Sequence, residues 1–239
     1  MTARELFAAG KLNEAIEALG AEMREHPADT QRRSFLFELL CFAGLWDRAD
    51  KQLDILAGDD KNKRMGALLY RGAINAARTR EEMFESGKFP EDSGAAEPPE
   101  LTFKVNGEDV LALEDADIRI GPRLEIIAGA NYLWIPFAHI STILIEPPQS
   151  LRDLIWIPAQ VRTRTGGADL GKVLLPVLTP FSWKHADPHV RLGRATVWEA
   201  GPDGTPLPHG QKLLLTSQEE EVPLLEVRTI EVAPAGAAS

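Results

Sequence analysis

Cysteine is nearly absent from this chain of 239 residues, since Cys41 is the only one. A single cysteine excludes an internal disulfide and a cysteine-based zinc site, and it makes the cytosol the expected compartment. Long hydrophobic runs are also missing, because no stretch approaches the ~20 apolar residues that span a bilayer. The first residues, MTAREL, carry an acid and lack an apolar core. We therefore expect no secretory signal peptide.

Clustered basic charge is scarce as well. The chain carries 26 Lys/Arg against 36 Asp/Glu, a formal net charge of −10. Nucleic acids and anionic lipid surfaces are bound through clustered Lys/Arg, so this balance argues against both kinds of partner. Two short basic spots, at 32–33 and 61–64, fall where helices are expected to begin, and we interpret them as solvated helix faces.

Proline is almost missing from the first third of the chain, where Pro27 is the only one of 17 prolines before residue 86. Alanine, leucine, glutamate and arginine dominate there, which favours helix. Residues 86–100 are rich in breakers and show no hydrophobic period, so they are interpreted as a linker. The predicted organisation is a helical domain at 1–85, a linker at 86–100, a β-rich domain at 101–233 and a disordered tail at 234–239.

The helical part contains an internal repeat. The motif AGKLNEA at 9–15 is echoed by AGLWDRA at 43–49, and the offset of 34 residues is the period of a tetratricopeptide repeat. Gly10 and Gly44 would each close one helix and permit a tight turn. The apolar spacing predicts helices at 2–9, 12–25, 30–43, 46–57 and 62–85. Two and a half repeats are close to the minimum that can bury a stacked core, so this part is expected to lean on the second domain or on a partner.

Short strand patterns dominate the second part. Asn106-Gly107 predicts a hairpin of 101–105 with 108–113, because both central positions of that turn need positive φ. The segment 128–131 predicts a second hairpin. The remaining expected strands are 124–127, 132–136, 140–145, 160–165, 173–178, 194–198 and 223–232, with 151–157 as a strand or a short helical entry. Pro176 suggests an edge strand or a bulge. The predicted fold class is α+β: an N-terminal tetratricopeptide-like α-α helical repeat domain, then a β-rich domain that is a bent sheet or small barrel.

Residues with catalytic or metal-binding chemistry are few. His185, Asp187 and His189 would share a face of a strand, but Pro188 disfavours a strand there, and a polar loop is the preferred interpretation. The run at 219–221 is interpreted as solvated acids and Cys41 as a buried small hydrophobe. No nucleophile elbow, phosphate-binding glycine loop or zincin motif is present. We predict no catalysis, no cofactor and no metal. The alternative is an enzyme, or a small-ligand or metal-binding protein, with a pocket in the β-rich domain.

Four stretches of the second part carry a family resemblance: WIPF at 134–137, LRDLIWIPA at 151–159, LLPVL at 174–178 and RLGRATVW at 191–198. Together with the order of the parts, they make the chain similar to the ImpE family, the TagJ or SciE-type accessory components of type VI secretion systems. The resemblance implies a cytoplasmic, virulence-associated, non-enzymatic adaptor. Its implied partners are a helical segment of the small subunit of the contractile sheath and the AAA+ ATPase that disassembles the contracted sheath. A general tetratricopeptide scaffold for an unrelated peptide is a third interpretation.

A partner surface can be predicted from the repeat, because the first helix of each tetratricopeptide pair lines the concave face. The residues so placed on the third and fifth helices are Gln31, Ser34, Glu38, Cys41, Phe42, Met65, Leu68, Gly72 and Asn75. This mixed groove would suit an amphipathic helix. Two alternatives stay open: the β-rich domain fills the groove, which makes these residues interdomain core, or the partner binds the Trp-rich β part.

Overall fold

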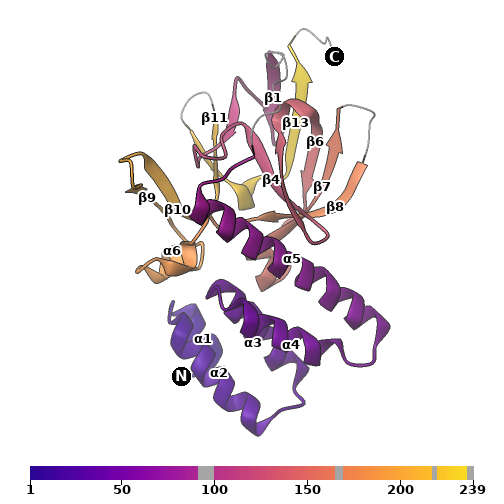
Figure 1. Ribbon diagram of the computed structural model, residues 1–239, viewed down its shortest axis with the longest axis vertical. Coiled ribbons are helices and arrows are strands. Elements are labelled where there is room, and N and C mark those ends of the chain that lie inside the picture. Colours follow the sequence, from indigo (N-terminus) through magenta and orange to yellow (C-terminus); the bar gives the residue numbers. More distant parts are fainter. Residues whose placement is uncertain (91–99, 165–168, 217–219, 236–239) are drawn as a thin grey trace.

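The computed structural model describes residues 1–90, 100–164, 169–216 and 220–235, and it places five helices before a strand-rich part (Figure 1). The five predicted helices are confirmed, and each packs on the next along the chain. The bounds of the helices are α1 (Ala3–Ala8), α2 (Leu12–Glu25), α3 (Thr30–Phe42), α4 (Trp46–Ala57) and α5 (Lys61–Ser86), with a sixth, α6 (Pro188–Arg191), within the strand-rich part. The prediction of α+β is therefore correct.

The two repeated turns end their helices in the same way. Gly10 and Gly44 adopt positive φ, 79° and 66°, which glycine reaches without the steric cost that a Cβ imposes. In each turn the residue after the glycine donates its N–H to the carbonyl five positions back, at 2.9 Å: Lys11 to Leu6 and Leu45 to Leu40. This is the Schellman arrangement of a helix C-terminus. The identical hydrogen bonds, 34 residues apart, explain why both turns contain Ala-Gly.

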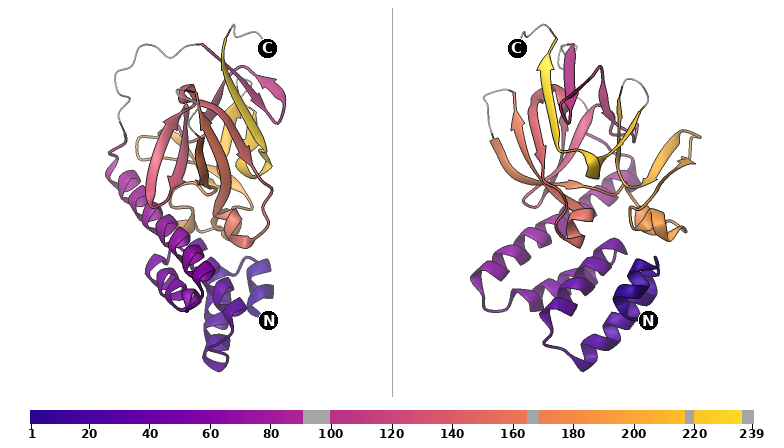
Figure 2. Two further views of the ribbon diagram at one scale, coloured as in Figure 1. Left: turned by 90° about the vertical axis from the view of Figure 1, so that its right-hand side faces the viewer. Right: turned by 180° about the vertical axis from the view of Figure 1, so that it is seen from behind.

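The strands are short and pair antiparallel in three sheets. Their bounds are β1 (Leu101–Val105), β2 (Glu108–Val110), β3 (Leu113–Asp115), β4 (Arg123–Ala128), β5 (Asn131–Pro136), β6 (Ile140–Ile145), β7 (Trp156–Thr163), β8 (Asp169–Pro176), β9 (Thr196–Ala200), β10 (Pro206–Gly210), β11 (Leu213–Thr216), β12 (Glu221–Pro223) and β13 (Thr229–Pro234). The eight-stranded sheet has the order β2-β1-β13-β6-β7-β8-β4-β5, beside a β12-β11-β3 sheet and a β10-β9 ribbon. Figure 2 shows that the large sheet is strongly curved and stands on α5.

Both predicted hairpins form. In the first, Val105 pairs with Glu108 across Asn106 (φ 52°) and Gly107 (φ 89°), the two positive-φ positions that the sequence indicated. In the second, Ala128 of β4 pairs with Asn131 of β5, so the turn is also two residues long.

Several strand boundaries were wrong. The segment 108–113 is divided, because β2 ends at Val110 and Leu113 starts β3 in another sheet. At 151–157 the short helical entry, one of the two predicted alternatives, is confirmed by a 3₁₀ turn, η2 (Leu151–Leu154). The strand expected at 160–165 starts earlier, because β7 begins at Trp156 and ends at Thr163, and residue 165 lies outside the described residues. The segment 223–232 contains the end of β12, a 3₁₀ turn and most of β13. The pairs β9-β10 and β11-β12 were not anticipated, apart from part of β9.

Pro176 has a different role from the predicted edge or bulge. Strand β8 lies inside the sheet between β7 and β4, and Pro176 is its last residue, opposite Trp156. A proline is tolerated there because the next residue, Val177, supplies the N–H that binds the Ile155 carbonyl, at 2.9 Å.

The two faces of the large sheet belong to two hydrophobic cores. Alternate residues along neighbouring strands point to opposite faces. The side chains that enter the interior of the curved sheet include Ile126, Ile157 and Leu175. Those on its outer face, which join the core of the helices, are Ile127, Trp156 and Leu174. The helical part is thus covered by the sheet, and the stacked helices bury one of their faces against it.

Candidate partner-binding groove

An open groove of about 650 Å³ runs between α1 and α3 and ends against the connection from β6 to β7. Its lining residues are Arg4, Phe7, Thr30, Gln31, Ser34, Phe35, Glu38, Ser150 and Leu151. We call this surface the α1–α3 groove. A second hollow of about 410 Å³ continues it past Arg4, Gln31 and Phe35. Both parts of the chain therefore contribute walls to one surface.

Local sequence signals hold the two helices that form the groove. Thr2 and Glu5 cap α1 reciprocally in a capping box. Asp29 begins α3, because its Oδ1 accepts the N–H groups of Gln31 and Arg32 at 3.0 Å. This N-cap fixes the residue at which α3 begins. Ser34 lies three positions after Gln31, and Glu38 lies four positions after Ser34, so all three residues lie on one helix face.

Aromatic packing builds the apolar floor of the groove. The Phe7 ring lies 5.9 Å from Phe35 in an edge-to-face arrangement and 6.0 Å from Phe42. The Arg4 guanidinium lies over the Phe35 ring, 5.0 Å from its centroid. Leu151 adds an apolar group from the β part. The groove is therefore apolar in its floor and polar along its rim.

Glu38 introduces a carboxylate into this floor. Burial raises the pKa of Glu38, while the positive charges of Arg152 and Arg4 act in the opposite direction. Within the described chain, no hydrogen bond or ion pair reaches its carboxylate. The Arg152 guanidinium lies over the ring of Tyr70, at 5.2 Å.

The predicted partner residues separate into three groups in the structure. Gln31, Ser34 and Glu38 line the α1–α3 groove. Phe42 is fully buried beneath the groove. The α5 residues lie apart from the groove: Met65 and Leu68 are each 62% exposed, and Asn75 is exposed and accepts a hydrogen bond from Arg78.

The other two residues that the sequence placed on the concave face, Cys41 and Gly72, are in contact with the β part. A Cβ on Gly72 would lie 2.5 Å from the carbonyl oxygen of Gly129 in the β4–β5 turn. Cys41 is buried, which raises the pKa of its thiol. It lines a small cavity of about 50 Å³ between the helices and the sheet. At these two positions the sheet covers the helices, as the interdomain alternative predicted.

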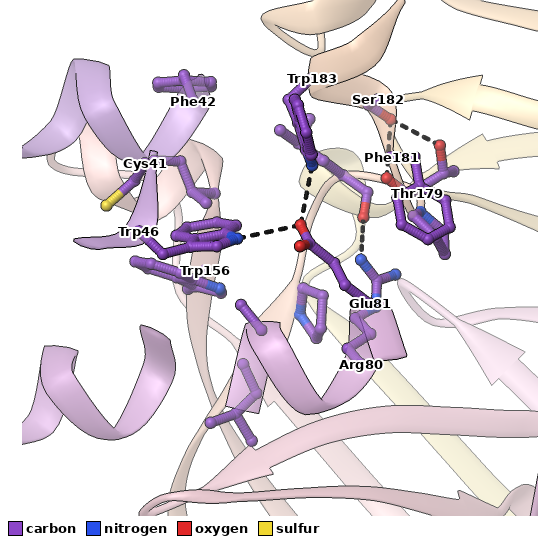
Figure 3. Close-up of a pocket in the computed structure, with 16 residues that line it drawn as sticks. Cys41, Phe42, Trp46, Arg80, Glu81, Trp156, Thr179, Phe181, Ser182 and Trp183 are labelled. Carbon is purple, nitrogen blue, oxygen red and sulfur yellow. Dashed lines mark hydrogen bonds between the residues drawn. The ribbon is translucent and has the colours of Figure 1, made fainter. Parts of the chain in front are cut away.

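Figure 3 shows the side chains that line that cavity and the hydrogen bonds between them. The Glu81 carboxylate on α5 accepts the indole N–H of Trp46 at 3.1 Å and that of Trp183 at 2.8 Å. The Trp183 ring also packs closely on Gly44, because a Cβ on Gly44 would lie only 2.6 Å from the nearest ring atom. One acid thus joins α4, α5 and the segment after β8. These tryptophans are structural groups of the contact rather than a free patch.

A buried ionic cluster lies at the same contact and was missed by the sequence analysis. Arg80 of α5 donates two hydrogen bonds to Glu125 of β4, at 2.7 and 2.8 Å. Lys212 bridges Glu125 to Asp115, and the Tyr132 hydroxyl also donates to Glu125. No local pattern indicates this cluster, because Arg80 and Lys212 are distant in the chain from each other and from the segment that contains Asp115, Glu125 and Tyr132.

The charged groups of this cluster shift one another's pKa values. Burial alone would raise the pKa of Glu125, but Arg80 and Lys212 outweigh it and hold that pKa at about 2. Burial raises the pKa of Asp115 to about 6, with Lys212 acting against it. The charged groups of the cluster are paired, and Arg80 also lines the small cavity beside Glu81. The role of the cluster is to attach α5 to the sheet.

The histidine-rich segment does not gather into a metal site. His185 Nδ1 accepts the N–H of Asp187, and its Nε2 donates to Glu199 at 3.0 Å. Asp187 instead caps α6 by accepting the N–H of His189 at 2.7 Å. In the described ranges no group of three or more His, Cys, Asp or Glu is arranged to hold a metal. Of the acidic run at 219–221, residue 219 lies outside the described residues.

A helical part joined to a curved antiparallel sheet, with an open groove between α1 and α3, defines the α+β class of this protein. The chain belongs to the ImpE family, whose model, described as ImpE protein, matches residues 107–231. It is 32% identical over 271 aligned positions to the type VI secretion system accessory component TagJ of Pseudomonas aeruginosa, covering 99% of this chain and 93% of that protein. The family resemblance seen in the sequence is thereby confirmed.

A solved structure shares the whole fold. The crystal structure of a protein from Vibrio parahaemolyticus superposes with a TM-score of 0.83 at 23% identity, and covers 98% of both chains. At this identity the likeness shows the fold alone. None of the helices in the described ranges combines the length and the apolar character of a membrane-spanning segment.

Proposed function

We propose that this protein is a cytoplasmic, non-enzymatic adaptor of a type VI secretion system. In this proposal it binds a helical segment of the small subunit of the contractile sheath and links it to disassembly by the AAA+ ATPase. The observation that carries the proposal is the near full-length similarity to TagJ, which is named an accessory component of such a system. An adaptor needs surfaces rather than reactive groups, and this agrees with a described chain whose buried charged cluster is fully paired.

The proposal includes a tetratricopeptide-like nature for α1 to α4. Its support is the 34-residue offset of the Ala-Gly motif together with the matching hydrogen bonds of the two turns. Such repeats commonly present a groove to a peptide or helix. The domain division at 86–100 also remains a proposal, since α5 ends at Ser86, β1 starts at Leu101, and residues 91–99 lie outside the described residues.

Among the predicted surfaces, the α1–α3 groove is the one that we propose for the sheath subunit. It is open, it contains three of the nine residues predicted for the partner surface, and its aromatic floor resembles the sites in which amphipathic helices bind. Met65 and Leu68 form a separate exposed apolar area on α5, which is a second candidate surface. The AAA+ ATPase would then need a surface that the sheath subunit leaves free.

The experiment is co-purification of the sheath small subunit and the ATPase with the tagged protein from secretion-competent cells. Glu38→Lys changes the α1–α3 groove and Leu68→Asp changes the α5 surface. Glu17→Lys, at an exposed position of α2 that does not line the groove, is the matched control. We expect Glu38→Lys to lose the sheath subunit while the control retains it. Absence of the sheath subunit from the wild-type protein would reject the proposed partner.

A further inference from the structure

Glu38 differs from other partly buried acids of the helices because its carboxylate has no hydrogen-bond donor or cation bound to it among the described residues. The carboxylates of Asp50 and Glu125 bind arginines at hydrogen-bond distance. The Glu38 carboxylate is half-buried between Phe35, Leu151 and the rim of the groove, and none of the described residues donates to it. Its pKa is raised by this burial.

A desolvated carboxylate without a donor is unfavourable, and a ligand that supplies one relieves that cost. The partial burial of Glu38 makes a new ion pair stronger than a fully solvated one, because water screens it less. A charged hydrogen bond at this position would therefore contribute to affinity, whereas an apolar group over Glu38 would add to its desolvation.

The surroundings of Glu38 specify the rest of the ligand. Phe7, Phe35 and Leu151 offer apolar contact on either side of it. Arg152, over the Tyr70 ring, and Arg4, stacked on Phe35, place positive charges near Glu38, and Asp153 adds a negative one, so a second cation from the ligand is repelled there. A single cation surrounded by apolar groups is the complementary pattern.

We propose that the α1–α3 groove selects an amphipathic helix that carries one lysine or arginine within its apolar face, paired with Glu38. This inference depends on the proposed function for the identity of the partner, and it adds the chemistry by which the groove recognises that partner. The basic residue replaces the missing donor, and the apolar residues one turn before and after it cover Phe7, Phe35 and Leu151.

The first test uses three designed helical peptides of about 20 residues, long enough to form stable helix. They are identical except that one position in the apolar face is lysine, norleucine or glutamate. We expect the wild-type protein to bind the lysine peptide most tightly and Glu38→Gln to lose about tenfold in affinity for that peptide only, the loss of one charged hydrogen bond. Glu17→Gln, the same change on an exposed face, should bind as wild type does.

Equal affinity of wild type and Glu38→Gln for the lysine peptide would overturn the inference, and so would the absence of binding by all three peptides. Thermal unfolding of Glu38→Gln, expected to match wild type, separates lost recognition from lost folding. The lysine peptide should also bind more weakly as acid protonates Glu38, and Glu38→Gln should remove this dependence.

The second test uses a synthetic peptide of the helical segment of the sheath small subunit. If it fails to bind while the lysine preference holds, the proposed partner is wrong and the groove chemistry stands. If it binds wild type and Glu38→Gln equally, while the lysine peptide also shows no dependence on Glu38, the partner stands and the groove chemistry is wrong.

Discussion

Gly72 shows how one missing side chain permits the contact between the two parts of the molecule. It lies in the middle of α5, where glycine is a poor helix former, yet any Cβ would meet the Gly129 carbonyl at 2.5 Å. The β4–β5 turn can therefore approach the helix backbone only at this residue. Gly66, also inside α5, has nothing within 4 Å of its Cβ position.

Substitution of these two glycines should have opposite effects on stability. We expect Gly72→Ala to lower the free energy of unfolding by about 1–3 kcal/mol, because backbone must move. Gly66→Ala should raise it by about 0.5–1 kcal/mol through helix propensity. Urea unfolding measures both, and equal effects of the two changes would contradict the close approach at Gly129.

Arg80 and Glu125 form the other strong attachment of α5. The Arg80 side chain is 11% exposed and that of Glu125 is 0% exposed. Removal of the Arg80 guanidinium takes two hydrogen bonds and one positive charge from the buried Glu125 carboxylate, which keeps only Lys212 and Tyr132. Arg80→Met should therefore lower the free energy of unfolding by roughly 3–5 kcal/mol. The exposed pair of Arg78 with Asp47 provides the control, since Arg78→Met should change stability little.

The same pair predicts a dependence of stability on acid. The folded-state pKa of Glu125 is about 2, below the unfolded value of about 4.3. Its contribution is present above the unfolded pKa and is lost as pH falls through about 4 towards 2. Asp115, with a raised pKa, acts in the opposite direction between about 6 and 4. We expect the melting temperature to fall below about pH 4, and Glu125→Gln to fall less steeply.

Among the helices and strands, the sequence predicted correctly those features that are set by interactions between neighbouring residues. Both hairpin turns and the repeated Ala-Gly turns depend on a few neighbouring residues. Strand boundaries failed where distant pairing decides them. The segment at 108–113 is apolar enough for one strand, but β1 pairs only as far as Val110, and Leu113 pairs with Thr216 in another sheet.

Glu81 connects two elements through Trp46 and Trp183. The sequence did not predict this contact, because both tryptophans are distant from Glu81 in the chain. Glu81→Ala leaves two indole N–H groups without their acceptor, so we expect a loss of about 2 kcal/mol in unfolding free energy and a change in tryptophan fluorescence. The neighbouring exposed Glu82→Ala should leave both unchanged. Equal behaviour of the two variants would show that this contact does not hold α4 against the segment after β8.

The whole molecule is organised around a core that both parts share. Trp156 stacks near Trp46 and Tyr70, at 6.0 and 6.4 Å, and the sheet covers the helices through its outer face. The sequence indicated that the short repeat array needs support, and it left open whether a partner or the second part supplies it. Along β4, β7 and β8 neighbouring side chains alternate between the two cores, and this alternation shows that the outer face of the sheet supports the helices.

A fragment of residues 1–86 should therefore be only marginally stable or should self-associate. The full chain should unfold in a single transition. Loss of Trp156, Ile127 and Leu174 exposes a face of the helices that the sheet covers in the intact protein. Calorimetry and size-exclusion chromatography measure the two behaviours. A monomeric fragment with its own cooperative transition would show that the helices do not need the sheet.

We propose that the α1–α3 groove holds the small sheath subunit, and site-specific photo-crosslinking in secreting cells can show whether it does. A photoreactive amino acid is placed at Ser34 in the groove, at Leu68 on α5 or at Glu17 on the far side of α2. We predict a crosslink to the sheath small subunit from Ser34 and none from Glu17. A crosslink to that subunit from Leu68 or Glu17 with none from Ser34 would contradict the claim.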